Sequence, residues 1–172
     1  MLIKGTRICL TEVRGEDSET MYRWINDAET VRFNAPYLPV SWANHSAWFD
    51  GLGKNPSRVV LAIRGIEGQA IIGIIQLLDI HPVHRTAELT TRIGDDRHRG
   101  KGHGTEALKL AISFAWRDLN LQRIWLRVFA TNTRAIRVYK KAGFTTEGTL
   151  RRAAWIDGQW VDELVMAVLR EV

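Results

Sequence analysis

The sequence contains one cysteine, Cys9, and four prolines in 172 residues. A single cysteine cannot form an internal disulfide, which excludes a disulfide-stabilised fold and favours a reducing compartment. The longest apolar run, residues 70–75, is far too short to cross a bilayer. Residues 1–20 carry charges throughout and lack the apolar stretch of a signal peptide. We therefore expect a cytoplasmic protein that does not span a membrane.

The composition is that of an ordinary globular protein, with 45% hydrophobic and 25% charged residues. A length of 172 residues suits one domain, residues 1–172, with a full core. The net charge of +5 fits either a nucleic acid or an anionic small molecule as partner. No zinc-ligand spacing, helix-turn-helix pattern or RNA-binding aromatic motif accompanies the basic residues. An anionic cofactor is therefore the more economical explanation, with a basic nucleic-acid-binding module as the alternative.

The spacing of apolar residues predicts an α/β (α+β) fold. Alternating or continuous β-rich runs predict strands at 6–13, 59–63, 70–78, 86–94, 123–129, 144–156 and 159–169. Apolar residues at helical spacing predict helices at 18–26, 28–33, 41–52, 105–118 and 132–142, the first capped by Asp17 or Ser18. Pro36 and Pro39 make residues 34–40 a loop.

These elements assemble into a single mixed, mostly antiparallel sheet of about seven strands with helices on both faces. The three strands between residues 59 and 94 have short connections and should form an antiparallel meander. Strand 86–94, helix 105–118 and strand 123–129 form a β-α-β unit, whose strands should be parallel. Asp157-Gly158 is a strong hairpin signal between the last two strands.

Residues 97–104, with the sequence RHRGKGHG, place three glycines at alternate positions between a strand and a helix. A glycine-rich loop followed by a helix N-terminus presents backbone N–H groups to an anion, most often a phosphate. Arg97, Arg99 and Lys101 add positive charge. The alternative is a flexible surface turn. The pattern is neither the dinucleotide fingerprint nor a P-loop, but it contains R-x-x-G-x-G from Arg97 to Gly102.

Residues 132–144 read NTRAIRVYKKAGF. This stretch is similar to the N-x-x-A-x-x-x-Y-x-x-x-G-F signature of the GNAT N-acetyltransferase superfamily, whose members also carry R-x-x-G-x-G one helix and one strand earlier. Both motifs stand in the expected order, so the chain resembles that superfamily. Its ending, with Glu147-Gly148 and the Asp157-Gly158 hairpin, resembles the ribosomal-protein N-terminal and spermidine/spermine acetyltransferase branch.

The resemblance implies acetyl-CoA as co-substrate and requires no metal. In the family, strands four and five splay apart and the pantetheine arm lies between them. This places pantetheine and acetyl contacts at Arg92, Ile93 and Gly94, where a backbone N–H would polarise the thioester carbonyl. Asn132 would bond the pantetheine arm, or serve as a plain N-cap, or both. The pyrophosphate contacts would come from the loop and the first helical turn: Arg97, Arg99, Gly100, Lys101, Gly102, His103, Gly104 and Thr105.

Tyr139 matches the family tyrosine that returns a proton to the departing thiolate, although it could instead only pack its helix on the sheet. The base is less defined. Glu88 lies on strand 86–94, where several relatives carry a glutamate proposed to deprotonate the amine, and half-burial would raise its pKa. Its alternative role is an exposed residue paired with a cation. His81 and His84 are second choices, whereas His45 has the spacing of a packed residue.

The reaction implied is acetyl transfer from acetyl-CoA to a primary amine by direct attack. The acceptor is a protein N-terminus, a polyamine, or an amino-sugar or antibiotic amine. Polyamine sites need clustered carboxylates, and Asp27, Glu29, Asp50 and Asp79 are scattered along the sequence. A non-catalytic acyl-CoA-binding or sensor domain on the same scaffold is the alternative function. The resemblance also leaves a homodimer open.

Overall fold

An eight-stranded sheet forms the centre of the computed structural model, which describes residues 2–33, 38–68, 70–94 and 96–171. The strands are β1 (Ile3–Lys4), β2 (Ile8–Thr11), β3 (Val59–Gly65), β4 (Ile71–His81), β5 (Thr86–Ile93), β6 (Arg123–Phe129), β7 (Thr145–Ile156) and β8 (Gln159–Leu169). The helices are η1 (Gly15–Asp17), α1 (Ser18–Ile25), α2 (Ala28–Val31), α3 (Trp42–Asp50), η2 (Asp96–His98), α4 (His103–Arg117) and α5 (Thr133–Lys141).

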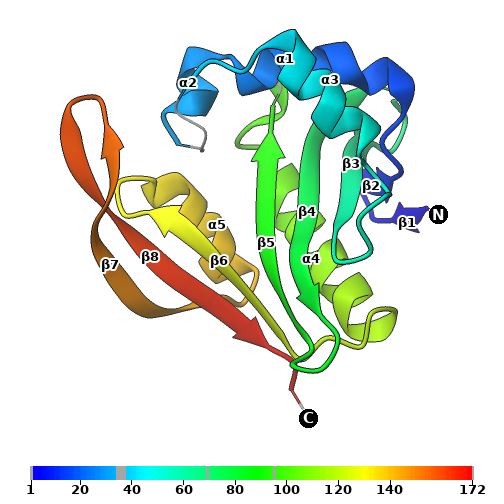
Figure 1. The fold of residues 1–172 in the computed structure, drawn as a ribbon. Coiled ribbons are helices and arrows are strands. Elements are labelled where there is room, and N and C mark those ends of the chain that lie inside the picture. Colours follow the sequence, from blue (N-terminus) through cyan, green and yellow to red (C-terminus); the bar gives the residue numbers. More distant parts are fainter. Residues whose placement is uncertain (1, 34–37, 69, 95, 172) are drawn as a thin grey trace.

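The strands lie in the order β1-β2-β3-β4-β5-β6-β8-β7 (Figure 1). All neighbours are antiparallel except β5 and β6, which are parallel and joined by α4. The predicted mixed, mostly antiparallel fold is therefore confirmed. The sheet has one strand more than the seven predicted, because β1 is only two residues long and leaves no periodic signal. Of the predicted loop 34–40, residues 34–37 lie outside the described residues.

Helices cover both faces of the sheet, as predicted. We call the face that packs on α4 and α5 the back face; its core includes Leu89, Leu108 and Leu126. The front face packs on α1 and α3 through a smaller cluster that contains Met21 and Ile74. None of the helices in the described part of the chain has both the length and the apolar character needed to cross a bilayer.

Local capping explains where several helices begin. The Ser41 hydroxyl accepts a hydrogen bond from Asn44 N–H at 3.2 Å, and the Asp27 carboxylate accepts one from Thr30 N–H at 2.9 Å. Asp17 precedes α1, but its carboxylate makes no capping bond to that helix. Of the two predicted caps, Asp17 thus occupies the N-cap position, but its side chain does not cap the helix, because buried Arg64 binds this carboxylate instead, at 2.6 Å.

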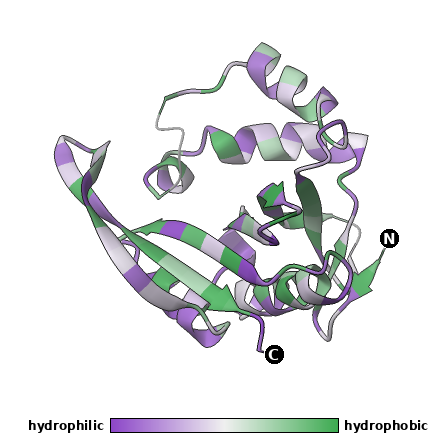
Figure 2. Ribbon diagram, turned by 60° about the horizontal axis from the view of Figure 1, so that its bottom comes forward, coloured by the Kyte–Doolittle hydropathy of each residue, from purple (hydrophilic) through white to green (hydrophobic). Residues whose placement is uncertain are grey.

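The β7–β8 hairpin extends beyond the body of the molecule as an arm (Figures 1 and 2). Its turn contains Asp157 and Gly158, both with positive φ, as the predicted Asp-Gly hairpin requires. At the tip, the rings of Trp155 and Trp160 pack edge to face with centroids 5.1 Å apart. One exposed ion pair, Arg32 Nε to Asp157 Oδ2 at 3.0 Å, joins this tip to the residue that follows α2.

Candidate active site

Strands β5 and β6 pair at only three positions, Thr86 to Glu88 with Arg123 to Trp125. On its other side β5 stays paired with β4 as far as Ile93. From Leu89 onward the edge of β5 that faces β6 is therefore open, and the two strands diverge (Figure 1). This confirms the predicted splay between the two strands.

The alternation of an antiparallel pair decides which backbone groups face this gap. Gly94 N–H donates to Ile72 O at 3.0 Å, toward β4. By the same alternation Arg92 also faces β4, whereas the backbone groups of Leu89, Thr91 and Ile93 face the gap. Of the predicted pantetheine contacts, Ile93 thus presents its N–H to the gap. Leu89 and Thr91 were missed, because sequence alone does not fix the pairing register.

The glycine loop leads into the N-terminus of α4, which begins at His103, two residues earlier than predicted. Gly100 and Gly102 have φ values of +75° and +83°, which side-chain-bearing residues rarely adopt. Glu106 is the first residue of α4 whose N–H donates to the carbonyl four residues earlier, which is that of the N-cap residue Gly102, at 3.1 Å. The N–H groups of residues 103–105 precede it and point out of the positive end of the helix.

The gap and the loop meet at Gly104. A Cβ built on Gly104 would lie 3.8 Å from Ile93 Cγ1 and 3.9 Å from Val138 Cγ1. The N-terminal turn of α4 therefore lies between the end of β5 and the middle of α5. Beside it, Arg134 Nη2 is 3.7 Å from the position of a Cβ on Gly100. The two sequence motifs are thus adjacent in space, as a single bound cofactor would require.

Arg7 and Glu106 fix the loop to the N-terminal strands. Arg7 Nη1 donates to Lys101 O at 2.8 Å, and Arg7 Nε lies 2.9 Å from Glu106 Oε2. Glu106 also accepts the backbone N–H of Thr6 at 2.6 Å. Sequence analysis missed this anchor, since about a hundred residues separate the partners and no motif links them.

The three cations of the loop have different surroundings. The Arg99 guanidinium donates to Ile93 O at 3.1 Å and to Thr30 Oγ1 at 3.2 Å, and it forms an ion pair with Asp96. Its side chain therefore joins the loop to β5 and α2 instead of extending toward a ligand. Lys101 is exposed, and Arg97 lies in η2.

His98 and His103 pack against each other with ring centroids 5.4 Å apart, and the Nδ1 atom of each is buried. Burial, with smaller contributions from nearby cations, lowers the pKa of His103. At neutral pH His103 is therefore mainly uncharged, and we expect its backbone N–H, not its ring, to serve an anion.

Tyr139 is buried on α5 in the back-face core, where its ring packs against Phe144 at a centroid distance of 5.8 Å. Burial raises the pKa of Tyr139 to about 12. The phenol therefore stays protonated at any physiological pH and is available as a hydrogen-bond donor. Asn132 caps the same helix, its Oδ1 accepting from Ala135 N–H at 3.1 Å.

Glu88 lies where β5 and β6 begin to separate. Its neighbours Ala87 and Leu89 point into the back-face core, so Glu88 points to the front. Burial raises the pKa of Glu88; Arg127 opposes this shift, and the carboxylates of Asp79 and Glu163 add to it. The half-burial expected of a base and the neighbouring cation expected of the alternative role are thus both present at Glu88.

Arg127 on β6 bridges two acids, with 3.8 Å from its Nε to Glu88 Oε1 and 3.6 Å from its Nη1 to Glu163 Oε2. The other candidate bases lie elsewhere. His81 and His84 stack on each other at 4.2 Å in the β4–β5 turn, at the closed end of the β5–β6 pair. His45 is buried with its Nε2 2.9 Å from Ser18 O, in keeping with the packed role.

A pocket of about 640 Å³ lies at the front, at the end of β5. Its lining combines acidic and basic residues around Trp24 and Gly94. A Cβ on Gly94 would lie 1.9 Å from Trp24 Cδ2, so the indole lies directly against this glycine. The Gly94 position is thus fixed by packing as well as by any role toward a cofactor.

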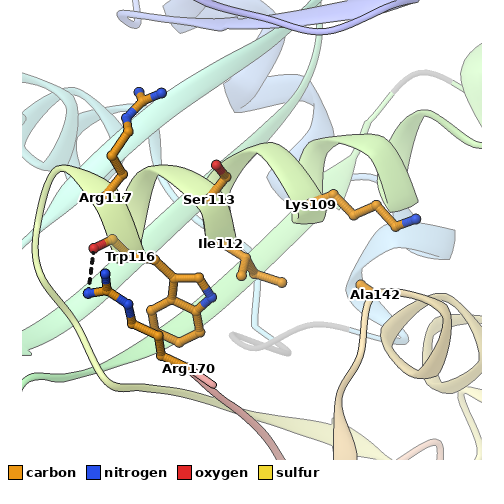
Figure 3. A pocket seen from close by; sticks show the side chains of 7 residues that line it. All are labelled: Lys109, Ile112, Ser113, Trp116, Arg117, Ala142 and Arg170. Carbon is orange, nitrogen blue, oxygen red and sulfur yellow. Dashed lines mark hydrogen bonds between the residues drawn. The ribbon is translucent and has the colours of Figure 1, made fainter. Parts of the chain in front are cut away.

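A second pocket, of about 420 Å³, lies along the C-terminal half of α4 (Figure 3). Lys109, Ser113 and Trp116 line it from α4, and Arg170 closes it by donating to Trp116 O at 3.0 Å. It is lined from the helix surface beyond the first turn and contains none of the predicted site residues. We do not assign it to the active site.

A splayed parallel pair inside an antiparallel sheet, with a helix N-terminus at the gap, is the arrangement that the resemblance to acetyl-CoA-dependent transferases implies. The acetyltransferase (GNAT) domain family matches residues 7–145, and the chain belongs to this family. The predicted resemblance is thereby confirmed.

Individual relatives match shorter parts of the chain. The spermidine N(1)-acetyltransferase of Escherichia coli K12 is 37% identical over 98 residues, 57% of this chain and 52% of that protein. An L-amino acid N-acetyltransferase of E. coli K12 is 38% identical over 73 residues, 42% of this chain and 45% of that protein. The matched part of the chain thus spans about half the length of these relatives.

The fold as a whole is shared with solved structures. The spermidine N-acetyltransferase of Vibrio cholerae, crystallised with CoA and spermine, superposes with a TM-score of 0.86 at 24% identity. The alignment covers 96% of each chain. At this level of identity the likeness establishes the fold.

Proposed function

We propose that the protein transfers an acetyl group from acetyl-CoA to a primary amine. The observation that carries this proposal is the meeting of the open β5 edge with the α4 N-terminus at Gly104. Together they offer one continuous path for a pyrophosphate followed by an extended amide-containing arm. Family membership supports acetyl-CoA as the molecule that takes this path.

The helix N–H groups of residues 103–105 would hold the pyrophosphate, and the open backbone of β5 would pair with the pantetheine amides. The Ile93 N–H faces the gap and is the candidate to polarise the thioester carbonyl. The thioester would then lie between the back face, where α4 and α5 pack, and the front face, where Glu88 points.

In the reaction, Glu88 would take the proton of the incoming ammonium, directly or through a water. The free amine attacks the thioester carbonyl, the C–S bond breaks as the tetrahedral intermediate collapses, the nitrogen gives up its remaining extra proton to water, and the thiolate takes up a proton. Tyr139 would supply this proton or a hydrogen bond to the sulfur. With a pKa of about 12, the phenol is better suited to hydrogen bonding than to complete proton transfer.

The acceptor amine is the open part of the proposal. Relatives named spermidine N-acetyltransferases make polyamines the first class to test. The L-amino acid N-acetyltransferase shows that acceptors without a polyamine chain occur among similar proteins. Which of these two classes of acceptor binds would depend on the charges at the front of β5.

A thiol-release assay with acetyl-CoA and a panel of amines tests the proposal. Cys9, the single cysteine, is buried, so the protein contributes little background to a thiol reagent. Acetyl-CoA at 100 times its Kd should also stabilise the fold by about 2.7 kcal/mol. Stabilisation without thiol release on any amine would favour the non-catalytic binding domain. The absence of both stabilisation and thiol release would refute the proposal.

A further inference from the structure

Arg92 is a half-buried cation, and none of the described residues acts as its counter-ion. Its side chain lies on the front face of β5, opposite Ile74 of the front-face core. Its Nε atom is buried and meets no hydrogen-bond acceptor, and within residues 2–33, 38–68, 70–94 and 96–171 the guanidinium forms no ion pair. Leaving a partly buried charge unpaired is costly, so this position favours an anionic partner that binds there.

The charge on Arg92 persists at neutral pH. Burial, together with the nearby Arg99 charge, lowers its pKa to about 10, which still leaves the guanidinium protonated. Other buried or half-buried arginines are treated differently by the fold. Arg64 is bound to Asp17 at 2.6 Å, and half-buried Arg123 is paired with Glu147. Arg92 therefore differs from them in lacking a carboxylate.

The cofactor phosphates do not account for Arg92. The N-terminal turn of α4 belongs to the back-face layer, while the Arg92 side chain points to the front. The front is the face that Glu88 also occupies, four residues earlier on the same strand. Residues i and i+4 of a strand lie about 13 Å apart along one face, and both side chains can lean inward.

The front of β5 thus carries an acidic end and a cationic end. Glu88 and Glu163, with Arg127 between them, offer a net negative environment where the ammonium of an acceptor would lose its proton. Arg92 offers an unneutralised cation at the other end, with Thr90 between them on the same face. A polyamine would place a second cation near Arg92, which is unfavourable.

We infer that the acceptor is an amine that also carries a carboxylate, such as a short peptide, with its ammonium at Glu88 and its carboxylate at Arg92. This inference rests on the proposed acetyl transfer, since it assigns the substrate class of the same site. A bidentate guanidinium–carboxylate pair is strong enough to decide between otherwise similar acceptors.

The test compares glycylglycine, glycylglycinamide and spermidine as acceptors. The first two differ only in carboxylate against amide. We expect kcat/KM for glycylglycine to exceed that for the amide by about tenfold or more, the usual worth of a hydrogen bond to a charged group. In Arg92→Gln this ratio should fall to near one, and in Arg92→Lys it should be partly retained. Arg123→Gln, which removes a β6 arginine paired with Glu147, should leave the ratio unchanged.

A binding measurement separates this inference from the proposed function. N-acetylglycylglycine and its amide are titrated into the CoA-bound protein by calorimetry, with and without Arg92→Gln. One result is that the wild-type protein binds the carboxylate better than the amide, loses this preference in Arg92→Gln, and turns over no amine. That result would refute the proposed acetyl transfer but support an anion-binding site at Arg92. Turnover of amines with no carboxylate preference, or a wild-type kcat/KM for spermidine above that for glycylglycine, would overturn the inference alone. Thermal unfolding of Arg92→Gln controls for folding, and its midpoint should not fall, because a half-buried charge without a partner is removed.

Discussion

Glu88 Oε1 lies 3.8 Å from Arg127 Nε, and Glu88 is the last residue of β5 that pairs with β6. This link lies at the start of the gap and joins the proposed base to a cation that lowers its pKa. The position of Glu88 and its protonation therefore depend on the same neighbour. Both can be tested by pH–rate profiles.

Glu88→Gln should lower kcat/KM by about 10²-fold, since a positioned base contributes on this scale. Burial raises the pKa of Glu88, and a base works only when deprotonated. Activity should therefore fall as the pH falls through this raised pKa, and the limb should vanish in Glu88→Gln. Acetyl-CoA affinity, measured by calorimetry, should stay within about twofold, because Glu88 faces away from the cofactor loop. An unaltered profile would exclude Glu88 as the base.

Arg127→Met removes the charge that opposes the raised pKa of Glu88. The pKa of Glu88 should then rise further, and the acidic limb of kcat/KM should move to higher pH. Arg123→Met, on the same strand but bonded to Glu147 at 2.7 Å, is the matched control and should leave the limb in place. A shift in both variants would point to a general loss of positive charge instead of the specific pair.

Tyr139→Phe should reduce kcat by about 10²-fold with little change in acetyl-CoA affinity. Because burial raises the pKa of Tyr139 to about 12, wild-type activity should show no loss from this group up to pH 10. Stopped-flow measurement of thiol release over pH 6–10 checks both points. Turnover equal to wild type would assign Tyr139 to packing against Phe144.

The sequence was sufficient for most of the fold because its local signals were unambiguous. Asp157-Gly158, Gly143 after α5, and the change of period around Arg58 each correspond to an observed boundary. The helix start at His103 was misplaced by two residues. In a glycine-rich stretch the sequence does not show where a helix begins, because glycine can adopt both helical and non-helical φ values. Here the change occurs at Gly102, and the helix begins at the next residue.

The parts of the candidate site that carry a sequence motif could be predicted. The parts that depend on how the strands pair could not. The loop and α5 carry motifs, and their contact at Gly104 follows from the β-α-β connection. Arg7, Arg127 and the unpaired state of Arg92 depend on which strands lie side by side and on which residues oppose each other. No local pattern encodes that information.

Asp17→Asn should destabilise the fold by about 3–5 kcal/mol, since it leaves a buried arginine without its partner. Arg64 is 2% exposed, and it binds Asp17 through two nitrogens and Thr11 Oγ1 through a third, at 3.0 Å. Urea unfolding followed by fluorescence measures the loss. Glu12→Gln, which removes only an exposed pair with Arg14, is the control and should leave the midpoint unchanged. Equal midpoints for both variants would contradict the structural role of the buried pair.

Gly104→Ala separates the needs of the cofactor from those of the fold. A Cβ at Gly104 would make only ordinary contacts with Ile93 and Val138, and alanine favours a helix over glycine by up to about 1 kcal/mol. The variant should therefore unfold at the same or a higher temperature, yet bind acetyl-CoA about tenfold more weakly, because the methyl group would occupy space beside the N–H groups that hold the pyrophosphate. Gly102→Ala is the contrast: its φ of +83° and the Arg7 guanidinium at 3.0 Å should cost about 1 kcal/mol or more in stability by itself. If Gly104→Ala binds acetyl-CoA as well as wild type does, the pyrophosphate does not approach α4 at this residue.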